Sequence, residues 1–507
     1  MAQGTQWHRM HRISFPPRFL DGGWYVVISP SPARMSSNRL LTASKSFVSD
    51  NRCLCGIAAM CVSTAHRQLQ GLGLAAGFAV DSAAAYASGV KQELYNIASR
   101  GTVEGFVDIV FVTGNDAGDL DSIVSALAVA YGYSQTGLVS GQHDGPTLFM
   151  PMVNIPRDEF RLRGDARLAF KKSGIDMDPA GAPTCYLFFE EVMALKPQLE
   201  KALRRPCGIA LTDHNTLGPS LQTVFSSEQV RAIVDHHADE GNHLNLPIAA
   251  RLVEAGVGSA CTLAAELLLS HDVSIPDDLG RLLYSAILID VRNFDTKAKK
   301  FNEKDERIMA KLSRFCPAPK RSLKEHQEWW YDELTDARAD IKGLSSGDLL
   351  KLDFKAVEVV GLRIGVSSIF ADVAGFMHLA GGRARLSAQA QHFADSRGLQ
   401  LLIMLTKASK ATTGEKQKGF IVLVPAQSPE LPDKVIAHLA DAPRSLSAEL
   451  LSSPLFQDQE IHKHGFGLAE ISRDCPASEM LRIFTIRRLI SRKTLLPTIA
   501  EALNRAS

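Results

Sequence analysis

The feature that most constrains the fold is an alternation of short apolar runs with stretches of helical pattern, beginning near residue 104. Residues 106–113 read as a buried strand, and residues 122–133 read as the helix that follows it. Strands that alternate with helices in this way form a parallel sheet covered by helices. We therefore expect an α/β domain over residues 104–300. Its further strands are expected at 147–153, 208–212 and 231–234, and its further helices at 261–270 and 279–289.

The length of 507 residues predicts more than this one domain, because single cores stop growing at about 250 to 300 residues. A charged, helix-prone stretch over residues 301–343 contains a Pro-Ala-Pro breaker and reads as a helical interdomain connection. A second, smaller apolar region occupies residues 344–507. Its strands are expected at 362–369, 399–405 and 420–424, and a final helix after Pro497.

Residues 1–103 are predicted to be an N-terminal extension. Its first 75 residues hold eight Arg or Lys residues against two acidic ones, which is typical of a transit peptide. A disordered tail or a wrongly assigned start codon would give the same composition. The extension is therefore either a signal for import into an organelle or a segment without a targeting function.

The overall composition is that of an ordinary globular protein, with 22% charged residues and a formal net charge of +1. No apolar run reaches the roughly 18 to 20 residues that cross a bilayer, so we expect a soluble protein without a membrane partner. The eight cysteines are scattered and read as free thiols. A site for a polyanion must be a local concentration of charge.

The first chemically informative motif is the turn after the first predicted strand, where Asn115, Asp119, Asp121 and Ser122 follow one another. Polar side chains at the carboxyl end of a parallel strand lie where open α/β sheets bind ligands. The two acids can converge on a dication if the turn is tight, and Asn115 adds a neutral oxygen. Taken alone, such a turn is more often a helix N-cap than a metal site.

Two further strands end in the same manner. Asp213-His214-Asn215 follows the strand at 208–212, and Asp235-His236-His237 follows the strand at 231–234. Packing does not require carboxylates at one edge of a sheet, where they would repel one another. A metal centre explains them, and Asp290, at the end of an apolar helical stretch, becomes a candidate buried ligand.

In this order, N-x-x-x-D-x-D-S, D-H-N, D-H-H and a late helical Asp resemble the DHH phosphoesterase superfamily, in its branch of prune proteins and eukaryotic exopolyphosphatases. Near the C-terminus, Asp353-Phe354-Lys355 and Ser491-Arg492-Lys493 resemble the D-x-K and S-R-K motifs of the DHHA2 domain. The resemblance runs from about Val107 to the C-terminus. It implies a parallel-sheet DHH domain, a smaller α/β DHHA2 domain and an active site in the cleft between them.

The resemblance also implies a site of two divalent cations, Mg²⁺ or Mn²⁺. One cation is expected on Asn115, Asp119 and Asp213, and the other on Asp121, Asp213, His236 and Asp290, so that Asp213 bridges them. Two cations roughly 3.5 to 4 Å apart clamp a phosphoryl group and acidify a water that then attacks as hydroxide. Asp235 is expected to orient the histidines.

Substrate phosphates are expected on a second group of residues that the resemblance implies: His237, Lys355, Arg492 and Lys493. Arginine offers a planar fork of donors to a phosphate, and lysine offers a point charge. With Asp213, His237 is the residue that we expect to be catalytic.

Within the family, Asn115 favours an exopolyphosphatase that releases orthophosphate from inorganic polyphosphate, because pyrophosphatases of the family carry His there. The intact His237 counts against the prune type, and a longer segment over residues 141–186 suits longer substrates. A manganese or magnesium pyrophosphatase, a prune-like phosphodiesterase and a catalytically degenerate regulatory protein remain alternatives. A nucleic-acid substrate is not expected, because no G-G-G-H element is present. The family indicates the cytoplasm, whereas the basic N-terminal segment indicates a mitochondrion or another organelle.

Overall fold

The computed structural model describes residues 82–139, 145–316, 322–359, 361–410, 416–423, 468–470, 481–486 and 495. Residues 1–81, which hold the basic segment, lie outside this set, as do Arg492, Lys493 and the helix expected after Pro497. Within the described residues, no helix combines the length and the apolar character needed to cross a membrane. Four cysteines can be assessed, and all are free thiols as expected: Cys185, Cys207, Cys261 and Cys316.

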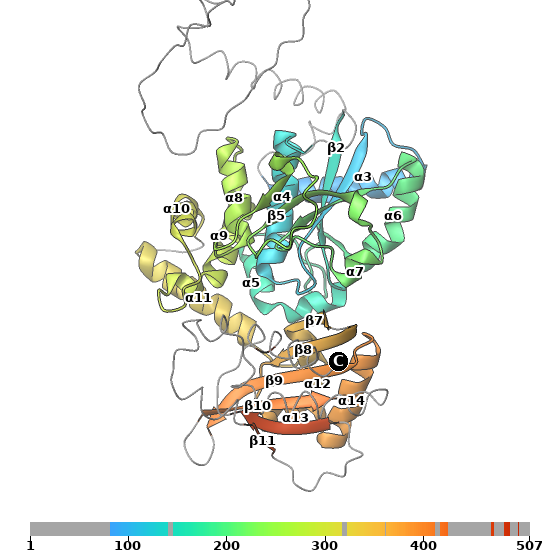
Figure 1. Ribbon diagram of the computed structural model, residues 1–507. Coiled ribbons are helices and arrows are strands. Elements are labelled where there is room, and N and C mark those ends of the chain that lie inside the picture. The colour runs from blue at the N-terminus through green and yellow to red at the C-terminus, as the bar shows by residue number, and fades with distance from the viewer. Residues whose placement is uncertain are drawn as a thin grey trace, which may run out of the picture. The chain divides into compact units, whose positions relative to one another are not determined.

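The first domain is built on a six-stranded sheet in the order β3-β2-β1-β4-β5-β6, and every neighbouring pair is parallel. This confirms the predicted parallel α/β class. Figure 1 labels two of these strands, β2 and β5, among the helices of this domain. The strands are β1 (Asp108–Thr113), β2 (Thr147–Val153), β3 (Leu187–Phe188), β4 (Gly208–Thr212), β5 (Val230–Asp235) and β6 (Arg251–Val253).

Helices join and cover these strands because their apolar faces are buried in one common core. The helices are α3 (Ala83–Arg100), α4 (Leu120–Thr136), α5 (Gly164–Lys172), α6 (Phe189–Leu203), α7 (Pro219–Gln222), α8 (Ala260–Ser270), α9 (Asp277–Asp290), α10 (Glu303–Leu312) and α11 (Leu323–Ala339).

Two boundaries of the first domain differ from the prediction. Helix α3 lies in the stretch assigned to the N-terminal extension, yet Leu94 and Ile97 on it are fully buried in the core. Asp278 caps α3 by accepting hydrogen bonds from the Ser82 hydroxyl and the backbone of Ala83. Helices α10 and α11, expected in the connection, also bury their apolar faces in this core. The connection is therefore packed onto the first domain.

The second domain is a mixed six-stranded sheet in the order β11-β12-β10-β9-β8-β7, with its own core. Strands β8 and β9 pair in parallel, and the other pairs are antiparallel. Its elements are α12 (Ser346–Leu352), β7 (Phe354–Val359), β8 (Leu362–Ile369), α13 (Val373–Ala380), α14 (Arg383–Asp395), β9 (Leu401–Lys410), β10 (Lys416–Leu423), β11 (Leu468–Glu470) and β12 (Leu481–Ile486).

The strand order of the first sheet places its ligand site. From β1 the chain adds β2 and β3 on one side, then returns to add β4, β5 and β6 on the other. The order therefore reverses between β1 and β4, and open α/β sheets bind ligands outside the carboxyl ends of the strands at this reversal. The turns that follow β1 and β4 begin at Gly114 and Asp213, so the predicted motifs flank that position.

Candidate metal centre

The turn after β1 folds tightly against the start of α4. A Cβ atom on Gly114 would lie 2.4 Å from the Cβ of Ser122, so only glycine allows this approach. Asp119 is the N-cap of α4, and its Oδ1 accepts a hydrogen bond from the backbone N–H of Ser122 at 3.1 Å. The tight turn therefore keeps Asn115 and Asp119 at the same edge of the sheet.

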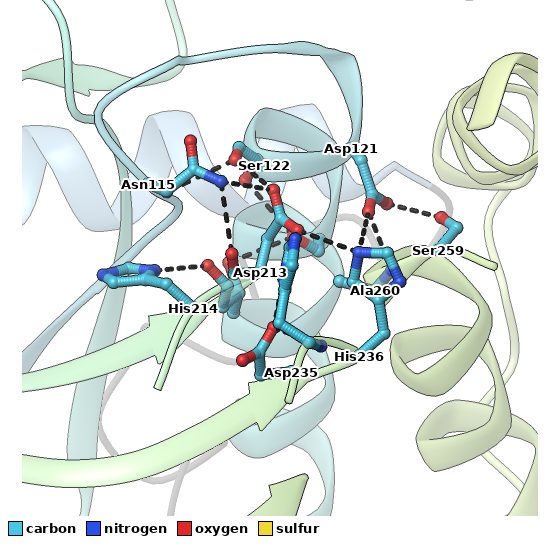
Figure 2. A network of polar contacts seen from close by, with 12 residues as sticks. Asn115, Asp121, Ser122, Asp213, His214, Asp235, His236, Ser259 and Ala260 are labelled. Atoms are coloured by element: carbon cyan, nitrogen blue, oxygen red, sulfur yellow. Dashed lines mark hydrogen bonds and ion pairs between the residues drawn. The ribbon is translucent and has the colours of Figure 1, made fainter. Parts of the chain in front are cut away.

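Asp213 stands at the centre of the polar network at this edge (Figure 2). It is 3% exposed, and its backbone takes a left-handed φ of 60°, which is strained for a residue other than glycine. Its Oδ2 accepts hydrogen bonds from the Ser122 hydroxyl at 2.6 Å and from the Asn115 amide nitrogen at 2.8 Å. Its Oδ1 lies 3.2 Å from Nε2 of His236.

The two histidines after β5 are held by different partners. The Nδ1 atom of His236 lies 2.9 Å from the carbonyl of Val257, so Nδ1 donates there and Nε2 faces Asp213. The Nδ1 atom of His237 lies 2.9 Å from Asp235, which is fully buried. Asp235 therefore orients His237, whereas the expected role of Asp235 toward His236 belongs to the carbonyl of Val257.

The carboxylate of Asp121 also accepts hydrogen bonds from the start of α8, which the sequence did not predict. Its Oδ1 accepts hydrogen bonds from the Ser259 hydroxyl at 2.6 Å and from the Cys261 backbone at 2.8 Å, and its Oδ2 accepts one from the Ala260 backbone at 2.7 Å. These groups form the N-terminus of α8, which Ser259 caps. Asp121 Oδ2 also lies 3.8 Å from His236 Nε2, so this oxygen reaches the same centre.

The electrostatics show excess negative charge at the centre. Burial and the charges of Asp121 and Asp119 raise the pKa of Asp213 to about 6. Burial and the charges of Asp121, Asp119 and Asp213 raise the pKa of Asp290, the last residue of α9, well above its ordinary value. A bound dication would neutralise this repulsion.

The donor set fits a divalent cation. Within the described residues, the ligand atoms of Asp213, His236 and His237 lie within 4.8 Å of one another. His237 joins this group, although the sequence assigned it to the substrate. Imidazole and carboxylate donors together suit first-row divalent metals. For Asn115 to offer its oxygen to a cation, its amide must turn over, because its nitrogen now faces Asp213.

The residues predicted to bind substrate phosphates are only partly described. Lys355 is exposed on β7, and Arg492 and Lys493 lie outside the described residues.

Arg163 is a contributor that the motifs did not single out. It is 7% exposed, and its Nε and Nη2 atoms donate hydrogen bonds to the carbonyls of Ala117 and Gly118 at 2.7 to 3.1 Å. It therefore fixes the turn between Asn115 and Asp119. The run of arginines at 157–163 was the available sequence signal, but it could not show which of them is buried.

Two family models match the chain at the residues that build this fold and centre. The model described as "DHH family, N-terminal domain" matches residues 109–287, and the model described as "DHHA2 domain" matches residues 332–502. The chain therefore carries a DHH-family N-terminal domain, followed by a DHHA2 domain.

Among named proteins, the chain is similar to human "Exopolyphosphatase PRUNE1", with 30% identity over 58% of this chain and 59% of that protein. The rat protein of the same name is 32% identical over 55% of this chain and 56% of its own length. The chain is also 26% identical to "Manganese-dependent inorganic pyrophosphatase" of Methanothrix thermoacetophila, over 39% of this chain and 59% of that protein. The chain thus spans less than two thirds of the length of these relatives.

Proposed function

We propose that the protein is a metal-dependent hydrolase of phosphoanhydride bonds and, more specifically, an exopolyphosphatase that releases orthophosphate from the ends of inorganic polyphosphate. The observation that carries the proposal is the arrangement at the strand reversal. Asp213 is shared there between Asn115 on one side and His236 on the other, at 2.8 and 3.2 Å. A relative named as an exopolyphosphatase and another named as a pyrophosphatase support this reaction class.

In this proposal, Asn115, Asp119 and Asp213 hold one divalent cation, and Asp121, Asp213, His236 and Asp290 hold the other. Two Mg²⁺ or Mn²⁺ ions, when bound, polarise the phosphoryl oxygens and make a water acidic enough to attack at neutral pH.

His237 contacts the phosphoryl group being transferred. Its side chain is 42% exposed, while its Nδ1 is engaged by Asp235. Its Nε2 is therefore the atom left for the substrate. When the ring carries both protons, Nδ1 donates to Asp235 and Nε2 donates to a phosphoryl oxygen. Lys355, Arg492 and Lys493 bind further phosphates, as basic residues do at phosphoryl-transfer sites.

A pyrophosphatase is the alternative enzyme, and the residue at position 115 distinguishes it from an exopolyphosphatase. An amide offers an oxygen to the cation, and oxygen ligands suit Mg²⁺, whereas an imidazole suits softer metals. We expect Asn115→His to move the preference from polyphosphate toward pyrophosphate and from Mg²⁺ toward Mn²⁺.

Orthophosphate release by the purified protein tests the proposal. Pyrophosphate, tripolyphosphate, long-chain polyphosphate and cyclic AMP are compared with Mg²⁺ and with Mn²⁺. We expect faster release from long chains than from pyrophosphate, and no release in chelator. Cleavage of pyrophosphate alone would show that the protein is a pyrophosphatase and not an exopolyphosphatase. Cleavage of cyclic AMP would favour a prune-like phosphodiesterase. If nothing is cleaved with either metal, the result favours the alternative of a catalytically degenerate regulatory protein.

A further inference from the structure

The C-terminal end of α11 is held against the start of α5 by a close backbone contact. A Cβ atom on Gly164, the first residue of α5, would lie 2.0 Å from the carbonyl oxygen of Ala337. Trp330 and Leu334, earlier in α11, are fully buried in the core of the first domain. Arg338 follows Ala337 in the chain, so its backbone is held against the first domain, which contains the metal centre.

The side chain of Arg338 is anchored at one atom and otherwise open. Its Nε lies 3.6 Å from Oδ2 of Asp165, which is a charge contact longer than a hydrogen bond. Asp165 is buried, and its Oδ2 has no hydrogen-bond partner within the described residues. The Arg338 side chain itself is 42% exposed. Its guanidinium thus has donors available, and a buried carboxylate holds it in place.

The charge of Arg338 acts on the metal centre. The pKa of Arg338 is raised by Asp165 and also by Asp119 and Asp290. Burial alone would raise the pKa of Asp119, yet that pKa is lowered, and Arg338 is the charge that lowers it most. The geometry agrees with this, because Asp165 lies two residues after Arg163, whose guanidinium donates to the carbonyls of Ala117 and Gly118 in the turn between Asn115 and Asp119. The Arg338 side chain therefore lies on the side of the domain that holds this turn.

We propose that Arg338 is a further substrate-binding residue, which binds a phosphate group of the polyphosphate chain with the guanidinium donors that Asp165 leaves free. This inference rests on the proposed function. Four carboxylates at the centre would balance two dications, so the charge of the incoming phosphates must be met by cations at the rim. Arginine does this with two parallel hydrogen bonds to one phosphate.

The test compares Arg338→Gln with Lys324→Gln in the full-length protein loaded with Mn²⁺. Lys324 is a matched control, because it lies in the same helix, carries the same charge and is 87% exposed. We expect Arg338→Gln to raise the KM for tripolyphosphate and to weaken inhibition by orthophosphate about 10- to 100-fold, as loss of hydrogen bonds to a charged group does. Arg338→Lys keeps the charge but loses the planar fork and should be intermediate.

Mn²⁺ binding, followed by electron paramagnetic resonance, separates this role from damage to the metal site. Removal of a nearby cation cannot weaken Mn²⁺ binding electrostatically, so we expect the affinity of Arg338→Gln for Mn²⁺ to equal or exceed that of the wild type. A purely structural ion pair predicts instead that Arg338→Gln and Asp165→Asn lower the melting temperature alike and leave KM unchanged.

The outcomes are distinguishable. If the wild type releases no orthophosphate from any polyphosphate, the proposed function is overturned. If the wild type is active and Arg338→Gln has the KM of Lys324→Gln, only the role of Arg338 is overturned. Should Arg338→Gln fail to fold, Arg338→Lys decides, and a KM and an orthophosphate inhibition equal to those of the wild type would exclude the two parallel hydrogen bonds to phosphate that the proposal assigns to this residue.

Discussion

Asp213→Asn separates the stability of the fold from the binding of a cation. Burial and the charges of Asp121 and Asp119 raise the pKa of Asp213 from 3.8 to about 6. A carboxyl group with a raised pKa destabilises the folded state above that pKa and has no such effect below its unfolded value. The rise from 3.8 to about 6 corresponds to about 3 kcal/mol at pH 7.5 in the absence of metal.

The neutral amide of Asp213→Asn removes this cost, although loss of the charged contact with His236 at 3.2 Å offsets part of the gain. In chelator at pH 7.5 we expect the variant to exceed the wild type in free energy of unfolding by about 1 to 3 kcal/mol. The difference should shrink as the pH falls from about 6 toward 4, between the folded and the unfolded pKa of Asp213.

Cation binding should show the opposite order. Mn²⁺ at 100 times its Kd should stabilise the wild type by about 2.7 kcal/mol, and it should stabilise Asp213→Asn much less. Urea unfolding followed by circular dichroism, with chelator and with Mn²⁺, measures both effects. The reasoning is refuted if the variant is less stable than the wild type in chelator at pH 7.5 and gains the same stability from Mn²⁺.

Three further substitutions test separate parts of the site. His237→Gln should lower kcat about 100-fold or more while Mn²⁺ still binds, because the side chain serves the phosphoryl group; an unchanged kcat would remove it from the catalytic residues. Gly164→Ala should destabilise the fold by several kcal/mol, since its Cβ would lie 2.0 Å from a carbonyl oxygen of α11; a wild-type melting temperature would contradict the close approach. Arg163→Met should raise the Kd for Mn²⁺ even where the variant remains folded, because the guanidinium fixes the carbonyls of the turn that holds Asn115 and Asp119. A Kd for Mn²⁺ equal to that of the wild type would show that the turn keeps its shape without Arg163.

The sequence predicted the elements whose signals are local. Strands β2, β4 and β8 were placed to the residue, because each is an apolar run bounded by polar or glycine-containing turns. Helix α3 was missed as part of the domain. Its register in the core depends on Asp278, which lies 195 residues away from its partner Ala83. No local pattern reports such a contact.

The same distinction applies to the site. Asp213, Asp235 and His236 were predicted together because each follows a strand end, and strand ends of a parallel sheet meet at one edge. The contact of Asp121 with the start of α8 joins residues 138 apart, and the contact of Arg338 with Asp165 joins two helices. The sequence could therefore name the acids but could not show which of them also cap helices.

The carboxylates gathered at this edge of the sheet differ in the direction of their pKa shifts, and their places at opposite helix ends favour the same difference. Asp119 caps the positive end of α4, where a helix carries about half a positive charge. Asp290 is the last residue of α9, at the negative end. Burial would raise the pKa of Asp119, but the charge of Arg338 and the hydrogen bond from the Ser122 backbone lower it. The pKa of Asp290 is raised well above its ordinary value by burial and by its carboxylate neighbours.

The pKa of His236 is also shifted in the metal-free centre. Burial lowers its pKa, but the contacts with Asp213 and Asp121 dominate and raise the pKa to about 10. At pH 7 the metal-free centre therefore holds a proton on His236, and the raised pKa of Asp290 favours a proton there as well. A dication must displace any proton on these ligands.

Calorimetry of Mn²⁺ binding in buffers of different ionisation enthalpy measures how many protons are released when the cation binds. Asp290→Asn should reduce this number by about one proton per cation, because the variant has no proton to lose at that position. Asp119→Asn should weaken binding and change the proton count less, because Asp119 has a lowered pKa and acts on the proton release only through its neighbours. Equal proton release from the wild type and Asp290→Asn would show that Asp290 is already ionised before the cation arrives, and that the helix ends do not set the charge of this centre.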